Sequence, residues 1–228
     1  MIITPQIAIK KLKSLLFING IPPKNLPKTE DYSLIACTDG AFHYLKEKNF
    51  PLEKLDFISG DFDSHCHAEL VEEYEALRKA QRDKIYKFEI IETPNQDKTD
   101  FQKALEILEE KNISEVQVYG GSGGEMDHFL GNLSVAFLFK ERLKITFFDE
   151  FSTYFFSPKH LVLENVKDKM ISLYPFPIAE NISTIGLKWQ LNNENLNLQS
   201  RIGTRNLAVQ DQVEINFENG ELIIFLQH

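Results

Sequence analysis

The chain has 228 residues, of which 43% are hydrophobic and 26% are charged, as in ordinary globular proteins. Its 34 Asp and Glu residues outnumber its 25 Lys and Arg residues, and the formal charge of −9 disfavours a nucleic-acid partner, because phosphate backbones are bound by clustered basic side chains. Two cysteines are too few for a disulfide framework or a cysteine-rich zinc site, and the first apolar run, Leu15–Ile18, is too short for a signal sequence or a membrane span, so we expect a cytoplasmic protein that does not enter a membrane.

Short apolar runs alternate with helical patterns along the first two-thirds of the chain, which predicts an α/β domain with a mostly parallel sheet. At the start of one helical pattern, Thr99 and Gln102 form a candidate capping box. The predicted strands are Leu15–Ile18, Leu34–Cys37, Asp56–Ser59, Phe88–Ile91, Val116–Tyr119 and Ile145–Phe148. The predicted helices are Ala41–Lys48, His67–Arg82, Asp100–Lys111 and His128–Phe139.

The pattern changes after about Phe151, where helical periodicity fades and short apolar runs recur between Pro, Asn and Gly. Asn219-Gly220 predicts a hairpin turn before the last strand, because this pair suits a turn with positive φ. We therefore expect an α/β domain over residues 1–150 and a small all-β sandwich domain over residues 151–228. The strands predicted in the second domain are Tyr154–Phe156, Ile171–Tyr174, Val213–Phe217 and Leu222–Leu226.

Acidic side chains recur where a predicted strand gives way to a helix. In an open α/β sheet, ligands bind beyond the carboxyl ends of the strands. Carboxylates gathered there offer oxygen ligands to Mg²⁺, and helix N-termini offer N–H groups to phosphate. We therefore predict a metal and phosphate site at this edge of the sheet. Four segments contribute to it: Thr38–Gly40, Gly60–Ser64, Gln96–Asp100 and Gly123–His128.

Each of these acids also has a structural interpretation. Asp61 and Asp63 point the same way on extended backbone, about 6.6 Å apart, and can share a cation, yet such a pair alone is more often a turn or a helix cap. Asp100 and Asp127 are also explained as first-turn acids favoured by the helix dipole. The glycine-rich segment Gly120–Gly124 fits neither standard nucleotide-binding motif, and a plain flexible turn is an alternative to a phosphate loop.

Taken together, the sequence resembles the thiamin pyrophosphokinase family. The likeness spans nearly the whole chain, in the family's order and approximate spacing, and the blocks Ser59–Ser64 and Asp97–Asp100 are its most specific parts. The matching stretches are Asn19-Gly20, Thr38–Ala41, Ile58–Ser64, Thr93–Asp100, Gly120–Gly124, Asp127-His128, Gly131-Asn132, Ile182–Trp189 and Gly203–Asn206.

The resemblance implies an enzyme that transfers pyrophosphate from ATP to the thiamin hydroxyl, giving thiamin diphosphate and AMP, with Mg²⁺ as cofactor. It implies a homodimer with thiamin sites where the subunits meet, the N-terminal domain binding nucleotide and magnesium and the C-terminal domain binding thiamin. Asp61, Asp63 and Asp100 would hold magnesium and the ATP phosphates, and Asp127 would lie near them as a fourth catalytic residue. The other implied ligand-binding residues are Asp39, Gln96, Lys98, Thr99, Gly123, His128, Asn132, Ser183 and Trp189.

Within that set, Gln96 would approach the thiamin pyrimidine, while Ser183 and Trp189 would complete the pocket from the other subunit. An indole face suits thiamin, a cationic aromatic molecule. A single tryptophan is otherwise more often an anchor of a hydrophobic core, so the burial of Trp189 separates the two interpretations.

Two residues depart from the family pattern. Glu125 stands where the family usually has an Arg two residues before the acid matched by Asp127, and Glu repels a phosphate that Arg would bind. Arg205 replaces a usual Ser, and it or Lys98 is a candidate to compensate. Two alternatives therefore stay open: a magnesium-dependent nucleotide hydrolase that uses the same acids, and a catalytically impaired protein that binds thiamin or nucleotide.

Overall fold

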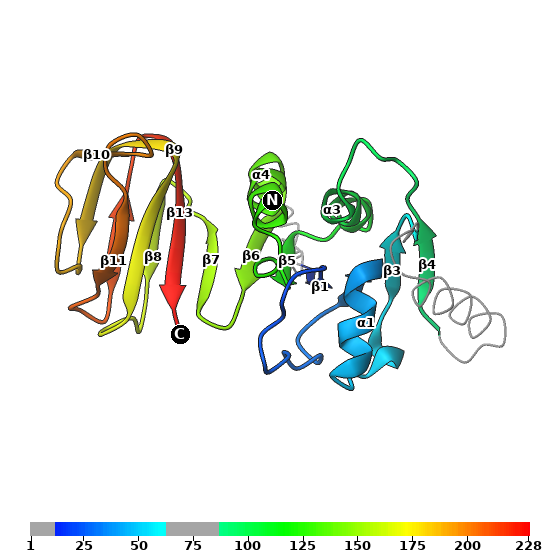
Figure 1. The fold of residues 1–228 in the computed structure, drawn as a ribbon. Coiled ribbons are helices and arrows are strands. Elements are labelled where there is room, and N and C mark those ends of the chain that lie inside the picture. The colour runs from blue at the N-terminus through cyan, green and yellow to red at the C-terminus, as the bar shows by residue number, and fades with distance from the viewer. Residues whose placement is uncertain (1–11, 63–86) are drawn as a thin grey trace, which may run out of the picture.

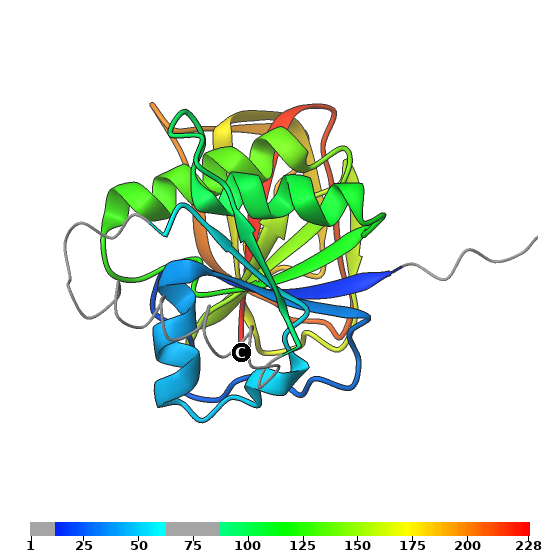
Figure 2. The same ribbon diagram turned by 90° about the vertical axis from the view of Figure 1, so that its right-hand side faces the viewer.

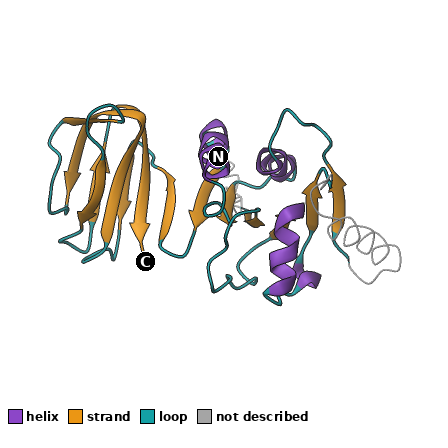
Figure 3. Ribbon diagram, viewed as in Figure 1, coloured by secondary structure: helices purple, strands orange, loops and turns teal. Residues whose placement is uncertain are grey.

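The structure is a computed structural model that describes residues 12–62 and 87–228, and Figure 1 shows its two parts side by side. One part holds parallel strands and helices, and the other is built of antiparallel strands, as the colouring of Figure 3 makes plain. One hydrogen-bonded path joins them in the order β4-β3-β2-β1-β5-β6-β7-β13-β9-β12-β8. The predicted fold class is confirmed.

Within residues 12–62 and 87–148, six parallel strands form the first part, and each lies within two residues of its predicted bounds. Their side chains alternate between the two faces of the sheet: Leu16 packs toward one hydrophobic cluster and Leu15 toward another. The strands are β1 (Lys13–Phe17), β2 (Leu34–Thr38), β3 (Phe57–Gly60), β4 (Glu89–Glu92), β5 (Glu115–Tyr119) and β6 (Lys144–Phe148).

Helices cover both faces of this sheet, as Figure 2 shows. The helices α3 (Asp100–Glu110) and α4 (Met126–Phe139) lie on one face, and α1 (Asp39–Glu47) lies on the other; a short 3₁₀ turn spans Leu52–Lys54. The helix predicted at 67–82 lies outside the described residues. None of the described helices has both the length and the apolar character needed to cross a membrane.

The second part is organised around one long strand, β9. Its 16 residues pair with β13 and β11 near the start, and with β12 and β10 near the end. The sequence predicted only a short strand here, because Pro175 and Pro177 read as interruptions. The strands are β7 (Ser152–Phe156), β8 (His160–Leu163), β9 (Met170–Ile185), β10 (Glu194–Asn197), β11 (Gly203–Leu207), β12 (Val213–Asn216) and β13 (Asn219–Gln227).

The predicted hairpin at Asn219-Gly220 is wrong. Strands β12 and β13 do not pair with each other; β12 pairs with Ser183–Ile185 of β9, and β13 pairs with its earlier residues. Gly220 does adopt a positive φ of 73°, as a turn glycine would, but it lies in a strand irregularity beside Ile178. The backbone conformation expected of a turn glycine is therefore present at Gly220. Long-range pairing with β9, however, determines the neighbours of β12 and β13.

An aromatic stack crosses the junction between the two parts. The Tyr154 ring is 1% exposed and lies parallel to the Phe147 ring at a centroid distance of 4.9 Å, and it stacks on Phe225 at 5.2 Å. These rings come from β6, β7 and β13, where β7 pairs antiparallel with both neighbours. The division predicted at residue 150 falls in the β6–β7 turn, and hydrogen bonds and ring packing make the two parts continuous across it.

Candidate active site at the carboxyl ends of the parallel strands

The strand order reverses between β1 and β5, because the chain passes from β1 to β2 on one side while β5 lies on the other. Open α/β sheets bind ligands at such a point, beyond the carboxyl ends of the strands. The loops that follow these two strands touch: a Cβ on Gly20 would lie 2.2 Å from the carbonyl oxygen of Gly120. Only glycine permits that approach.

Close packing continues from loop to loop along this edge. A Cβ on Gly40 would lie 2.6 Å from Asn19 Nδ2, and one on Gly60 would lie 2.3 Å from Asp39 Oδ2. The Asp39 carboxylate thus lies against the end of β3, where it accepts hydrogen bonds from the backbone N–H of Gly40 at 2.7 Å and of Phe62 at 3.2 Å. The glycines of the sequence motifs are needed because side chains of the neighbouring loop occupy their space.

Among the described residues, Asp39, Asp61 and Asp100 form a cluster in which one carboxylate oxygen of each lies within 4.8 Å of the others. They come from the start of α1, the loop after β3 and the start of α3. Opposite ligands of an octahedral Mg²⁺ site are about 4.2 Å apart, since each Mg–O distance is about 2.1 Å. This aspartate cluster can therefore hold a hard divalent cation.

The family resemblance implied that Asp39 binds ligand and did not include it among the magnesium ligands, although its segment, Thr38–Gly40, was one of the four predicted to gather at this edge. The structure places Asp39 among the candidate metal ligands. Asp63, the third predicted magnesium ligand, lies outside the described residues. The burial of Asp39, followed by the charges of Asp100 and Asp61, raises its pKa from 3.8 to about 6, although the two backbone N–H groups oppose the shift. A bound cation would offset both the burial of this carboxylate and its repulsion by the neighbouring acids.

Neighbouring polar groups hold the cluster in place. Gln96 Nε2 donates to Asp61 Oδ2 at 3.0 Å. Thr99 caps α3, since its side chain accepts a hydrogen bond from the backbone N–H of Gln102 at 3.2 Å. The Gln102 side chain binds Glu106 instead of returning to the cap, so half of the predicted capping box forms. Thr99 therefore contributes by fixing the helix start that carries Asp100.

Other predicted residues lie apart from the cluster. The Lys98 ammonium is bound by both Glu106 oxygens, at 2.8 and 2.9 Å, further along α3. Asp127 gathers with Glu125 and His128 in a second, exposed group at the start of α4, in which His128 Nε2 lies 3.4 Å from a Glu125 oxygen.

The glycine-rich loop between β5 and α4 has an open backbone. Gly120, Gly123 and Gly124 all have positive φ, between 67° and 79°, which turns the backbone in ways that few other residues adopt. Asn132 steadies the loop by donating to the Gly121 carbonyl at 3.0 Å, and Ser122 donates to Asp149 at 3.1 Å. Loops of this kind at a helix start present N–H groups to anions.

The remaining predicted residues lie in the antiparallel part. Trp189 is 56% exposed, so it is not a core anchor. Its backbone is fixed by Asn206, which accepts from its N–H at 3.1 Å and donates to its carbonyl at 2.6 Å, and the Lys188 ammonium lies 4.9 Å from its ring centre. Ser183 accepts a hydrogen bond from the Asn193 N–H at 3.1 Å. Beside Trp189 lies a small pocket of about 140 Å³.

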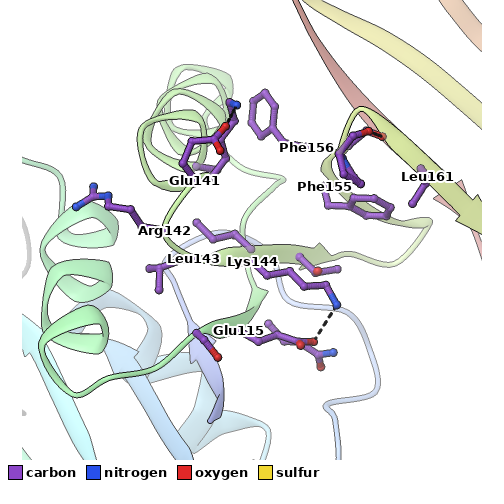
Figure 4. A pocket seen from close by; sticks show the side chains of 16 residues that line it. Glu115, Glu141, Arg142, Leu143, Lys144, Phe155, Phe156 and Leu161 are labelled. Atoms are coloured by element: carbon purple, nitrogen blue, oxygen red, sulfur yellow. Dashed lines mark hydrogen bonds and ion pairs between the residues drawn. The ribbon is translucent and has the colours of Figure 1, made fainter. Parts of the chain in front are cut away.

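A larger pocket, of about 770 Å³, lies at the opposite edge of the sheet (Figure 4). It opens where β5 and β6 begin, with Lys144 Nζ 3.5 Å from a Glu115 oxygen and with Phe155, Phe156 and Leu161 on its other side. The aspartate cluster lies at the carboxyl ends of the parallel strands, so this pocket is not part of the candidate active site.

Two family descriptions match the chain: "Thiamin pyrophosphokinase, catalytic domain" over residues 27–147 and "Thiamin pyrophosphokinase, vitamin B1 binding domain" over residues 159–222. Among relatives, thiamine pyrophosphokinase of Bacillus subtilis (strain 168) is 28% identical, covering 93% of this chain and 98% of that one. Thiamin pyrophosphokinase 1 of Caenorhabditis elegans is 29% identical, covering 87% and 82% respectively.

Solved structures share the fold. Thiamine pyrophosphokinase from Bacillus subtilis superimposes with a TM-score of 0.74 at 23% identity, covering 94% of this chain and 98% of that one. The yeast thiamin pyrophosphokinase has a TM-score of 0.74 at 17% identity, covering 96% and 86%. Since the catalytic-domain match alone takes in more than half of the sequence, the chain belongs to the thiamin pyrophosphokinase family.

Proposed function

We propose that this chain binds Mg²⁺ and ATP at the aspartate cluster and transfers the pyrophosphoryl group to thiamin. The observation that carries the proposal is the convergence of Asp39, Asp61 and Asp100 at the switch point of the sheet in a member of this family. The oxygen-only donor set fits magnesium, and Asp63, two residues from Asp61, is proposed to join it.

In the proposed reaction, the thiamin hydroxyl oxygen bonds to the β-phosphorus of ATP. The bond from that phosphorus to the oxygen it shares with the α-phosphorus breaks, AMP leaves, and the hydroxyl proton passes to a carboxylate beside the phosphates. Magnesium held by Asp39, Asp61 and Asp100 would neutralise charge on the phosphate oxygens. The chain positions the reactants, with the Gly120–Gly124 backbone and the start of α4 facing the triphosphate. Asp127, His128 and Asn132 are assigned to this side of the site.

Thiamin is proposed to bind between two copies of the chain. Six strand-to-strand steps separate β2 from β9, or roughly 29 Å at about 4.8 Å per step, and Figure 1 shows β3 and β11 far apart along the molecule. No side chain reaches from Trp189 to the aspartate cluster across that distance. The proposed site is completed in a homodimer. There, Trp189 and Ser183 of one copy face the aspartate cluster and Gln96 of the other copy. The exposed Leu130 and Leu138 of α4 are suited to burial by a partner.

The direct test is an assay of the purified protein with ATP and Mg²⁺, in which AMP and thiamin diphosphate are measured with and without thiamin. We expect the two products in equal amounts, and only when thiamin is present. Release of phosphate without thiamin would favour a nucleotide hydrolase. Saturable binding of ATP or thiamin with no AMP would favour a binding protein, and Glu125, exposed beside Asp127, is the residue that would explain it. A cytoplasmic location is proposed because ATP is the phosphoryl donor.

The raised pKa of Asp39 predicts a pH dependence of magnesium binding. Because Mg²⁺ binds the ionised carboxylate, its affinity should fall as the pH is lowered through about 6, and proton release on binding should be largest below that pH. In the cation-free protein the folded state holds the Asp39 proton more tightly than the unfolded state, so stability should decrease as the pH rises from about 4 to 6.

Calorimetric titration with Mg²⁺ at pH 5, 6 and 7, in buffers of different ionisation enthalpy, measures both the affinity and the proton release. The matched control is Asp39→Asn, in which affinity should be lower and nearly independent of pH over this range. Equal proton release by Asp39→Asn and the parent protein would contradict the assignment of the titration to Asp39.

A further inference from the structure

A buried lysine lies beside the aspartate cluster. Lys103, one turn into α3, is 5% exposed, and its ammonium lies 2.7 Å from Asp100 Oδ1. The same ammonium donates to the carbonyl oxygen of Thr93, just beyond β4, at 2.8 Å. No pattern in the sequence marks this residue, because an acid and a lysine three positions apart on a helix usually form a solvent-exposed pair.

Burial makes this lysine unusual. Lys98 and Lys111 flank α3 and also pair with acids, Glu106 and Glu89. They keep 37% and 39% of their side chains exposed, against 6% for Lys103. An ammonium is rarely buried unless close partners compensate for lost hydration. Here the partners are one oxygen of a candidate metal ligand and one backbone carbonyl, so the position of Lys103 and the position of Asp100 depend on each other.

We propose that Lys103 is a positioning residue that fixes the Asp100 carboxylate in the aspartate cluster. The contact with Oδ1 is an ion pair without hydrogen-bond geometry, and the hydrogen bond to Thr93 anchors the ammonium. Lys103 thus joins the end of β4 to the start of α3 and opposes movement of the Asp100 carboxylate away from the cluster. The carboxylate is thereby kept facing Asp39 and Asp61 before any cation binds. This inference rests on the proposed function, because it concerns the use of the same cluster.

The electrostatic effect of the ammonium runs in the opposite direction. A positive charge next to a metal ligand weakens cation binding, so a lysine that served only as a counter-charge would, on removal, leave a cluster that binds cations more tightly. A lysine that positions Asp100 would, on removal, leave a cluster that binds more weakly. Outer groups that orient metal ligands typically contribute 10- to 100-fold to affinity. The sign of the change therefore separates the two roles.

The experiment measures Mn²⁺ binding by electron paramagnetic resonance, without ATP or thiamin, for the parent protein and Lys103→Met. We expect affinity to fall about tenfold or more in Lys103→Met. The matched control is Lys111→Met, which removes the other ammonium joining α3 to β4, at Glu89, and should leave Mn²⁺ binding unchanged. Unchanged or tighter binding by Lys103→Met would overturn the proposal. If that variant does not fold, Lys103→Gln carries the same expectation.

A second comparison uses Asp100→Asn. If Lys103 acts through Asp100, adding Lys103→Met to Asp100→Asn should change Mn²⁺ affinity less than twofold, whereas a general structural role would lower affinity equally in both backgrounds. Because substrates are absent, the outcome does not depend on the reaction: a protein that binds Mn²⁺ but makes no thiamin diphosphate would refute the proposed activity and leave Lys103 in its role. A parent protein that binds no Mn²⁺ would overturn both.

Discussion

Replacement of Asp61 by Asn is expected to lower the rate of AMP formation about 1,000-fold at saturating ATP, Mg²⁺ and thiamin. The side chain keeps its size and loses its charge, so the cluster of Asp39, Asp61 and Asp100 holds a cation less well, and charge on the transferred phosphates is no longer neutralised. Removing one electrostatic stabiliser from an active site commonly costs 10²- to 10³-fold in turnover.

The measurement is the steady-state production of AMP and thiamin diphosphate, with circular dichroism to show that the variant is folded. Asp211→Asn is the control, because Asp211 is an exposed acid in the antiparallel part and the substitution removes the same charge. It should retain normal turnover. An Asp61→Asn enzyme with a rate within threefold of the parent would show that this carboxylate does not act on the phosphates.

Replacement of Trp189 by Ala is expected to raise the KM for thiamin about 10- to 100-fold and to leave the KM for ATP unchanged. The exposed indole face is well placed to stack on a cationic aromatic ligand, and such contacts are worth about 1–3 kcal/mol. Phe151→Ala is the control, since Phe151 is 75% exposed and lies in the β6–β7 turn. Equal KM values for thiamin in Trp189→Ala and the parent would remove Trp189 from the pocket.

Mixing the two variants, at a thiamin concentration far below the raised KM of Trp189→Ala so that neither variant alone is active, tests whether each site is shared by two chains. In a mixed dimer of Asp61→Asn and Trp189→Ala, one site receives an intact aspartate cluster from one chain and an intact Trp189 from the other. Random pairing gives half mixed dimers, so about a quarter of the parental activity should return after co-refolding. A site formed within one chain would give no recovery above the average of the two separate variants.

The parallel half of the fold was predictable because its signals are local. Continuous apolar runs such as Leu34–Cys37 indicate strands that are buried on both faces, and Thr99 marks the start of a helix through its side-chain hydrogen bond. The antiparallel half was not predictable in detail. Strand β9 continues through Pro175 and Pro177, and its pairing with four other strands depends on contacts between residues far apart in the sequence.

The candidate site divides in the same way. The positions of Asp39, Asp61 and Asp100 at strand and helix ends predicted that their segments gather at one edge of the sheet. The close approach of the three carboxylates could not be predicted, because it depends on how the Asp39 side chain packs against Gly60. Lys103 could not be recognised, because a helical lysine gives no sign of being buried until β4 and its following loop are placed around it. Residue types indicated that the site binds a metal and phosphate, and the packing of the folded chain determined which side chains take part.

The aromatic stack of Phe147, Tyr154 and Phe225 has a mechanical consequence. Together with the hydrogen bonds of β7 to β6 and β13, it leaves no hinge between the two halves of a subunit. The two halves should therefore move as one rigid body. Entry and exit of substrates then cannot depend on a clamshell motion within one chain. Substrate entry and product release should instead depend on small displacements of surface loops or on relative motion of neighbouring subunits. Such motions would make the rate of product release sensitive to solvent viscosity.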